Sequence, residues 1–111
     1  MAAVRVLEYL NEAGRSPYAK WFDDLDAMAA ARVSTAQFRL GQGNFSNVEG
    51  AGSGVFELKI DFGPGYRVYF GKDGETVVIL VGGSTKKRQS KAIEAAIAAW
   101  QNYKTRKKTG R

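Results

Sequence analysis

Cysteine and histidine are both absent from this chain of 111 residues. Without cysteine the chain forms no disulfide and no thiolate metal site, and without histidine it lacks the commonest metal ligand and the commonest general base at neutral pH. Catalysis would have to use carboxylates, lysines, arginines, tyrosines or backbone groups. No nucleotide-binding glycine motif is present either, so we expect neither a cofactor nor a metal.

Long apolar runs are also missing. No stretch approaches the roughly 20 residues that span a bilayer, and the N-terminus lacks the charged and apolar segments of a targeting sequence. We therefore expect a cytoplasmic protein with no membrane partner. With 44% hydrophobic residues, a chain of this length can build one core and has no room for a second domain of ordinary size.

Positive charge is abundant but unevenly distributed. Residues 1–54 carry five Lys or Arg against six acidic residues, whereas residues 55–111 carry twelve against five. The net charge of +6 therefore belongs to the second half of the chain. This asymmetry favours a polyanionic partner, most often a nucleic acid, although a basic tail alone can produce much of it.

The first half of the chain predicts a short strand followed by two helices. Apolar residues at 4–7 favour a strand. Ser16 is placed to cap a helix whose first residue is Pro17, where the missing N–H costs nothing. The Ala-rich segment 26–40 has helical spacing and lacks Gly and Pro. Residues 41–54 contain five glycines and predict a mobile loop, either moving on binding or serving as a slack connection.

Three strand-like runs at residues 55–60, 65–70 and 77–81 predict an antiparallel meander. In the first two runs apolar residues alternate with polar ones, as expected when one face is buried and the other is open. Pairing them as a hairpin places four side chains on the open face, namely Glu57, Lys59, Arg67 and Tyr69. The third run is apolar throughout, as in a central strand covered on both faces.

Gly82 and Gly83 are expected to break the third strand before a final helix that begins near Ser90. Past residue 103 the chain is too charged and too short to pack, so we expect residues 104–111 to form a disordered basic tail. The predicted order is a strand, two helices, a three-stranded meander and a closing helix. This order indicates an α+β fold in a single domain of residues 1–103.

Arg67 is the strongest candidate for a catalytic role. A nuclease without histidine can cleave RNA by helping the ribose 2′-OH attack the adjacent phosphate, provided that cations stabilise the negative charge of the transition state. The alternative is a surface arginine paired with Glu57 or Asp61. Lys59 faces the same way, and its alternative is a solvated ion pair on the sheet surface.

Lys86, Lys87 and Arg88 follow the third strand, where adjacent cations can clamp phosphates. Tyr69 is a candidate for stacking on a base or orienting a phosphate, with packing under the final helix as its alternative. Glu57 is the carboxylate best placed to act as a general base. The neighbouring cations would stabilise its charged form and so weaken it in that role.

The order of these pieces resembles the RelE/ParE superfamily of small toxins, in particular its HigB-like "addiction module killer" branch. The resemblance covers nearly the whole chain. Its pieces are Ser16-Pro17 before a Trp/Phe helix, residues 55–59, residues 65–70, the apolar third strand, Gly82-Gly83, Lys86-Lys87 with Gln89, and the Ala-rich last helix ending at Trp100. The fold implied is a RelE-like twisted antiparallel sheet with two N-terminal helices and a C-terminal helix packed on it.

The resemblance implies a type II toxin that cuts messenger RNA in the ribosomal A site and so inhibits translation, a metal-independent mRNA interferase. Its implied partners are the ribosome, mRNA and a cognate antitoxin, usually a small helix-turn-helix protein, with a larger toxin–antitoxin complex as a further expectation. Matching site positions are Lys59, Arg67, Lys86 and Lys87, while Glu57 and Tyr69 match less closely. Several ribosome-dependent members use a histidine that this chain lacks, which leaves the proton donor unassigned.

Two other functions fit the same sequence. A ParE-like DNA gyrase inhibitor would act through an interface and would need no catalytic cations. A non-catalytic nucleic-acid-binding module would depend mainly on the basic residues 104–111, and their removal would abolish its function. The nuclease hypothesis predicts only partial loss on the same truncation, through weaker electrostatic steering.

Overall fold

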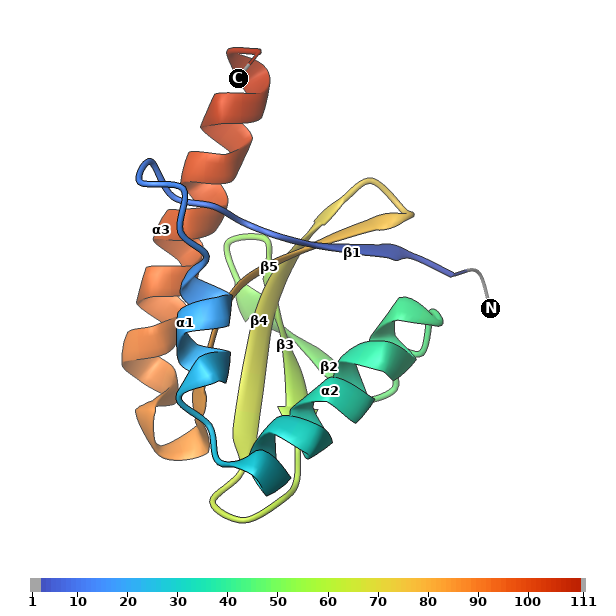
Figure 1. Ribbon diagram of the computed structural model, residues 1–111. Helices are drawn as coiled ribbons and strands as arrows, with labels where there is room; N and C mark the ends of the chain where they lie inside the picture. The colour runs from blue at the N-terminus through green and yellow to red at the C-terminus, as the bar shows by residue number, and fades with distance from the viewer. Residues whose placement is uncertain (1–2, 111) are drawn as a thin grey trace.

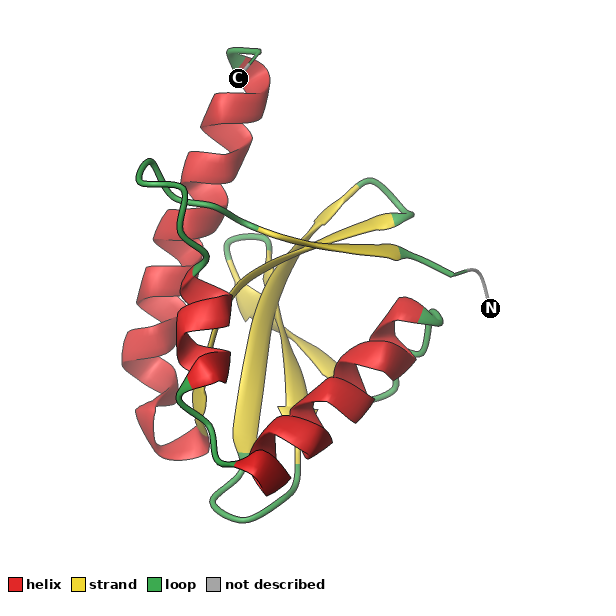
Figure 2. Ribbon diagram, in the orientation of Figure 1, coloured by secondary structure: helices red, strands yellow, loops and turns green. Residues whose placement is uncertain are grey.

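A single five-stranded sheet with helices on both faces organises the chain, as seen in a computed structural model that describes residues 3–110 (Figures 1 and 2). The strand order is β1-β5-β4-β3-β2. In chain order the elements are β1 (Arg5–Glu8), α1 (Pro17–Asp23), α2 (Ala27–Gly41), β2 (Val48–Gly52), β3 (Val55–Ile60), β4 (Tyr66–Asp73), β5 (Val77–Thr85), the 3₁₀ helix η1 (Lys86–Arg88) and α3 (Gln89–Lys108). The α+β class is therefore confirmed.

The sheet is mixed rather than purely antiparallel, which corrects the expectation. β1 pairs with β5 in parallel, and the β2/β3, β3/β4 and β4/β5 pairs are antiparallel. A parallel neighbour needs a long crossover, and here α1, α2 and the meander supply it. No helix among residues 3–110 is both long and apolar enough to cross a bilayer.

Both N-terminal helices begin where the capping residues predict. Ser16 accepts a hydrogen bond from the Ala19 N–H at 3.0 Å, and Pro17 occupies the first turn of α1. Asp26 caps α2 in the same way through the Ala29 N–H at 2.9 Å. Each cap satisfies a backbone donor that the helix itself leaves free.

Two apolar clusters, one on each face of the sheet, form the core. On one face α1 and α2 pack over Leu58, Val68 and Phe70. On the other face α3 packs through Ala96 and Trp100 over Val55, Tyr69, Ile79 and Val81. The face that carries Glu57, Arg67 and Tyr69 is therefore covered by α3, and the prediction of an open face is wrong. Alternation identified which side chains share a face, but it did not show that a helix lies over it.

Residues 41–54 contain a strand, so the prediction of a loop over the whole segment is also wrong. β2 pairs antiparallel with β3 and forms an edge of the sheet. The turn between them has positive φ at Ser53 (54°) and Gly54 (83°), which suits a tight two-residue hairpin. Backbone pairing with β3 orders this glycine-rich segment despite its low strand propensity.

β5 continues through Gly82 and Gly83 to Thr85, which corrects the prediction that these glycines break it. The register between β4 and β5 shifts after the Tyr69/Gly82 pair, because Phe70 pairs with Leu80 and leaves Val81 as an extra residue. Gly83 is required for packing: a Cβ there would lie 2.2 Å from Cε3 of Trp21. Glycine lets the α1 tryptophan contact the strand backbone directly.

The last helix continues to Lys108, so residues 104–108 are helical and the prediction of a disordered tail is not met there. Tyr103 donates a hydrogen bond to Asp73 Oδ2 at 2.5 Å, and the Lys107 ammonium pairs with the same oxygen. Arg106 donates to the Leu10 carbonyl and to Asn102 Oδ1. Cations in the last turn also interact favourably with the helix dipole. Arg111 lies outside the described residues.

We expect the contacts of Asp73 with Tyr103 and Lys107 to stabilise the fold by an amount that depends on pH. The hydrogen bond from Lys107, followed by that from Tyr103, lowers the pKa of Asp73 below its ordinary 3.8. We expect Asp73→Asn to lower the free energy of unfolding by about 1 kcal/mol at pH 7. Because the folded pKa is the lower one, this difference should persist above pH 3.8 and vanish as the pH falls through the folded pKa. Urea unfolding at pH 7 and at a series of lower pH values below 3.8 checks this, and a difference that does not decrease along the series would contradict it.

Candidate functional site

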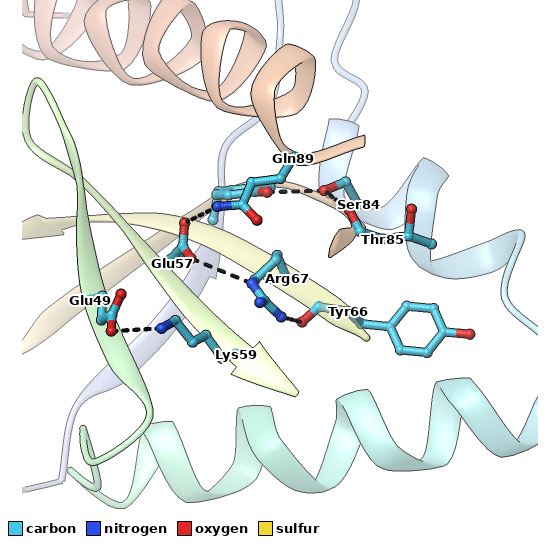
Figure 3. A network of polar contacts seen from close by, with 9 residues as sticks. Glu49, Glu57, Lys59, Tyr66, Arg67, Ser84, Thr85 and Gln89 are labelled. Carbon is cyan, nitrogen blue, oxygen red and sulfur yellow. Dashed lines mark hydrogen bonds and ion pairs between the residues drawn. The ribbon is translucent and has the colours of Figure 1, made fainter. Parts of the chain in front are cut away.

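Arg67 lies near the start of β4, and its backbone pairs with Lys59 on β3 and Ser84 on β5. Its side chain is only 7% exposed. One Nη1–H donates to the Tyr66 carbonyl at 3.0 Å, and Nε lies 3.4 Å from Glu57 Oε1 (Figure 3). The Nε–H makes an ion-pair contact but has no hydrogen-bond partner. The alternative pairing with Glu57 is therefore confirmed, although the pair is buried rather than on the surface.

Glu57 connects β3 to the beginning of α3. Its Oε1 faces Arg67, and its Oε2 accepts a long hydrogen bond of 3.4 Å from Gln89 Nε2 (Figure 3). With the side chain 6% exposed and both oxygens facing donors, this carboxylate holds its two neighbours in position. General-base catalysis would require one of these contacts to open.

Tyr69 is fully buried under α3, which confirms its alternative position and contradicts an accessible stacking surface. Its hydroxyl lies 2.9 Å from Ser84 Oγ, and Ser84 itself donates to the Thr85 carbonyl. Tyr69 is therefore the donor to Ser84. Burial raises the pKa of Tyr69 above its ordinary 10.0, despite the opposite effect of the Ser84 hydrogen bond. The hydroxyl keeps its proton at neutral pH.

Lys86 meets Arg67 at the turn between β3 and β4. The Lys86 N–H donates to the Gly65 carbonyl at 3.0 Å. A Cβ built at Gly65 would lie 3.3 Å from Lys86 Cβ and 3.9 Å from Arg67 Nη1. Gly65 also has a φ of +83°, which favours glycine. Without a side chain, Gly65 therefore lies close both to the stem of Lys86 and to Nη1 of Arg67.

Lys59 and Lys87 flank this pair in different ways. Lys59 Nζ lies 2.6 Å from Glu49 Oε1 on β2, so the lysine forms an ion pair on the sheet surface with Glu49 as its partner (Figure 3). Lys86, Lys87 and Arg88 are all exposed in η1, at the end of β5. Lys87 forms no ion pair with any residue from 3 to 110.

The six predicted site residues therefore separate into two groups. Arg67, Glu57 and Tyr69 are buried beneath α3, whereas Lys86 and Lys87 are accessible and Lys59 is partly so. Sequence reasoning missed the site roles of three further residues, Ser84, Gln89 and Gly65. Gln89 was visible only as part of the family resemblance, and the partners of Ser84 and Gly65 depend on strand pairing.

This arrangement is suited to binding one phosphate at an accessible edge. Lys86 is exposed, and its stem lies close to Gly65, as does Nη1 of Arg67, which Glu57 holds in place. Guanidinium and ammonium groups both bind phosphate oxygens. Within residues 3–110, no group of three His, Cys, Asp or Glu side chains is arranged to hold a metal ion. The cations at this edge can supply electrostatic stabilisation of a phosphate.

Comparison with known proteins gives one relationship. No model of a known protein family matches the sequence. The chain is 39% identical over 77 residues to an uncharacterized protein of Haemophilus influenzae strain KW20 Rd. The aligned segment covers 68% of this chain and 78% of the relative. The chain therefore belongs to the same family as this Haemophilus influenzae protein.

Proposed function

We propose that the protein is the toxin of a type II toxin–antitoxin system and acts as a ribosome-dependent endoribonuclease that inhibits translation. The observation that carries this proposal is the position of two cationic residues at the β3–β4 turn, where the stem of exposed Lys86 and Nη1 of Arg67 both lie close to Gly65. We assign the chain to the RelE/ParE superfamily, HigB-like branch. The meander and the final helix across it support this assignment.

In this proposal the scissile phosphate binds against Lys86 and the Nη edge of Arg67. Attack of the ribose 2′-OH on phosphorus, with loss of its proton to water, forms a cyclic phosphate and releases the 5′-oxygen of the next nucleotide, which takes up a proton from water. Both cations then stabilise the extra negative charge on the phosphoryl oxygens. Lys87 neutralises an adjacent phosphate. The site supplies little proton transfer, and alignment of the RNA by the ribosome is expected to provide much of the rate.

The proposed partners are mRNA on the ribosome and a cognate antitoxin, a helix-turn-helix protein in this branch. The charge distribution supports the first of these, since twelve of the 17 Lys and Arg residues lie in the second half of the chain. Cations on a surface accelerate encounters with a polyanion. A cytoplasmic location follows from the proposed target.

Lys86→Ala/Lys87→Ala tests the nuclease proposal without disturbing the core, because both side chains are exposed. We expect the intact chain to cut translated transcripts in frame, and the double variant to reduce these cuts at least about a hundredfold. The measurement is a map of transcript 5′ ends against reading frame after induction. Unchanged cutting would contradict the assigned role of these lysines.

Lys104→Ala/Lys108→Ala is the matched control, since it removes the same charge from the far end of α3. It should leave most in-frame cuts in place. If the control instead abolishes function while Lys86→Ala/Lys87→Ala does not, the protein is a nucleic-acid-binding module that depends on its C-terminal helix. Growth arrest by the intact chain with uncut transcripts would also exclude the nuclease.

DNA gyrase inhibition is a second candidate, and the burial of Arg67 with Glu57 favours it. At 6% exposure this arginine has a structural partner that fully accounts for its charge, and an inhibitor acting through an interface needs no catalytic cation. Such an inhibitor would trigger the DNA-damage response while transcripts remain intact. The transcript map and a damage reporter in the same cells distinguish the two functions.

A further inference from the structure

A second cationic hollow lies between α2 and the end of β3. Its volume is about 510 Å³. Arg32 and Arg39, which line it, are seven residues apart on α2 and therefore share one face of the helix. Both side chains are exposed, and neither forms an ion pair with any residue in the described range 3–110. Two cationic groups on one surface are thus left available for an anion.

Arg32 is already oriented for binding. Its guanidinium carbon lies 4.5 Å from the centre of the Phe62 ring. Stacking on an aromatic ring fixes the plane of a guanidinium but leaves its N–H donors free at the edge. Planar, oriented N–H groups are well suited to a phosphate. Asn47 and Thr35 add neutral hydrogen-bonding groups to the lining.

The charge of the hollow also favours an anion. Its lining carries three cationic residues, Arg32, Arg39 and Lys59, against one acid, Asp61. Lys59 is paired with Glu49, so the two arginines are the free cations. Like charges near one another repel, and a bound polyanion removes that cost.

The hollow adjoins the site at Arg67 and Lys86 through the β3–β4 turn. Phe62 lines the hollow, and Gly65, at the other end of the turn, separates Lys86 from Arg67. The Gly65 N–H donates to the Phe62 carbonyl at 2.9 Å. A turn closed in this way keeps its ends within about 7 Å of each other. α2 packs on the opposite face of the sheet from α3, and in Figure 3 it passes close to the end of β3.

We propose that this hollow binds backbone phosphates of single-stranded RNA next to the segment held by Arg67 and Lys86. The inference rests on the proposed function, because the neighbouring site identifies the anion as RNA. Arg32 and Arg39 bind one phosphate each, and Phe62 keeps Arg32 oriented. The hollow therefore extends the substrate contact beyond the scissile phosphate and adds no chemical step.

The test is direct binding of a short fluorescent 2′-O-methyl RNA, which lacks the 2′-OH and so cannot be cleaved. Arg32→Ala/Arg39→Ala should bind it at least about tenfold more weakly than the unchanged chain. The slope of log affinity against log salt should fall by about 1.4, since each single-strand phosphate contact contributes about 0.7. Arg5→Ala/Arg15→Ala removes the same charge from exposed positions on or before β1 and α1, and it should change affinity much less.

If the two double variants lose the same amount of RNA affinity, the inference is overturned, because the loss then reflects only non-specific charge attraction. Unchanged RNA affinity in Arg32→Ala/Arg39→Ala would also overturn it and would favour an acidic protein as the partner of the hollow. If the unchanged chain does not bind the RNA, the inference is also overturned. Arg32→Lys keeps the charge but loses the planar stack, and an affinity between those of the unchanged and double-variant chains supports the role of Phe62.

The binding test and the transcript map fail independently. If the unchanged chain binds RNA through this hollow but cuts no transcript, the nuclease proposal fails and the binding site stands. If the chain cuts transcripts in frame while Arg32→Ala/Arg39→Ala binds RNA normally, the nuclease proposal stands and the hollow is not a subsite.

Discussion

Arg67→Ala is expected to lower the free energy of unfolding by about 3–5 kcal/mol. The substitution leaves the Glu57 carboxylate, 6% exposed, without its cationic partner beneath α3. Desolvation of an unpaired carboxylate is costly, and Gln89 alone, at 3.4 Å, replaces little of the lost interaction. Urea unfolding at pH 7 measures the effect. Stability equal to that of the unchanged chain would show that the pair is solvated in solution.

Glu57→Gln/Arg67→Ala is the control that separates stability from chemistry. With neither charge left, the double variant should recover a large part of the lost stability, because no unpaired charge remains buried. Its in-frame RNA cleavage should stay absent, as expected if the guanidinium stabilises the transition state. If cleavage returns together with stability, Arg67 is a structural residue and the assigned chemistry belongs to other groups.

Gly83→Ala should lower the free energy of unfolding by about 1–3 kcal/mol, towards the upper end of that range. The new Cβ would lie 2.2 Å from Cε3 and 2.4 Å from Cδ2 of Trp21. The Trp21 ring cannot move away easily, because it contacts Tyr18 and Tyr66, with ring centres 6.0 and 6.4 Å away. Thermal and urea unfolding both report the change.

The neighbouring glycine gives a matched comparison. A Cβ at Gly82 would have no atom within 4 Å, and Gly82 lies in the same strand. Gly82→Ala should therefore change the free energy of unfolding by no more than about 0.5 kcal/mol. If both alanine variants are equally destabilised, the loss comes from the strand backbone rather than from contact with Trp21.

Local patterns predicted those parts of the fold that depend on neighbouring residues. Ser16 begins α1 at the position that capping predicts, and α2 lies where the Ala-rich segment with helical spacing predicts it. The alternation in β3 and β4 also places the correct four side chains on one face, where Glu57 lies opposite Tyr69 and Lys59 opposite Arg67. Each of these features is set within a few residues or by one hairpin.

Features that depend on distant segments were not predictable from the same patterns. β2 is ordered by pairing with β3, although its composition suggests a loop. The alternating polar and apolar residues predict that the sheet face of Arg67 and Tyr69 is open to solvent. In the structure α3, which lies about 30 residues later in the chain, covers that face. The end of α3 is held by Asp73, which sits in the β4–β5 hairpin. No local sequence window contains both partners of these contacts.

Residue types in the sequence predicted only part of the candidate site. Cations at 67 and 86 were predicted, and their meeting at Gly65 requires the β3–β4 turn and the end of β5 together. The pairing of Arg67 with Glu57 was foreseen as an alternative, but its burial was not. Burial changes the interpretation of any mutation at this position, because loss of function and loss of folding then occur together.

The parallel pairing of β1 with β5 constrains when the molecule can assemble. Arg5 pairs with Val77, which is 72 positions later in the chain, so the N-terminal strand has no neighbour in the sheet until most of the polypeptide has been made. At cellular synthesis rates of about 5–20 residues per second, this interval lasts roughly 4–14 s. α3, which closes over Arg67, is made later still. The sheet and the helix that covers it are therefore complete only after both β5 and α3 have been synthesised.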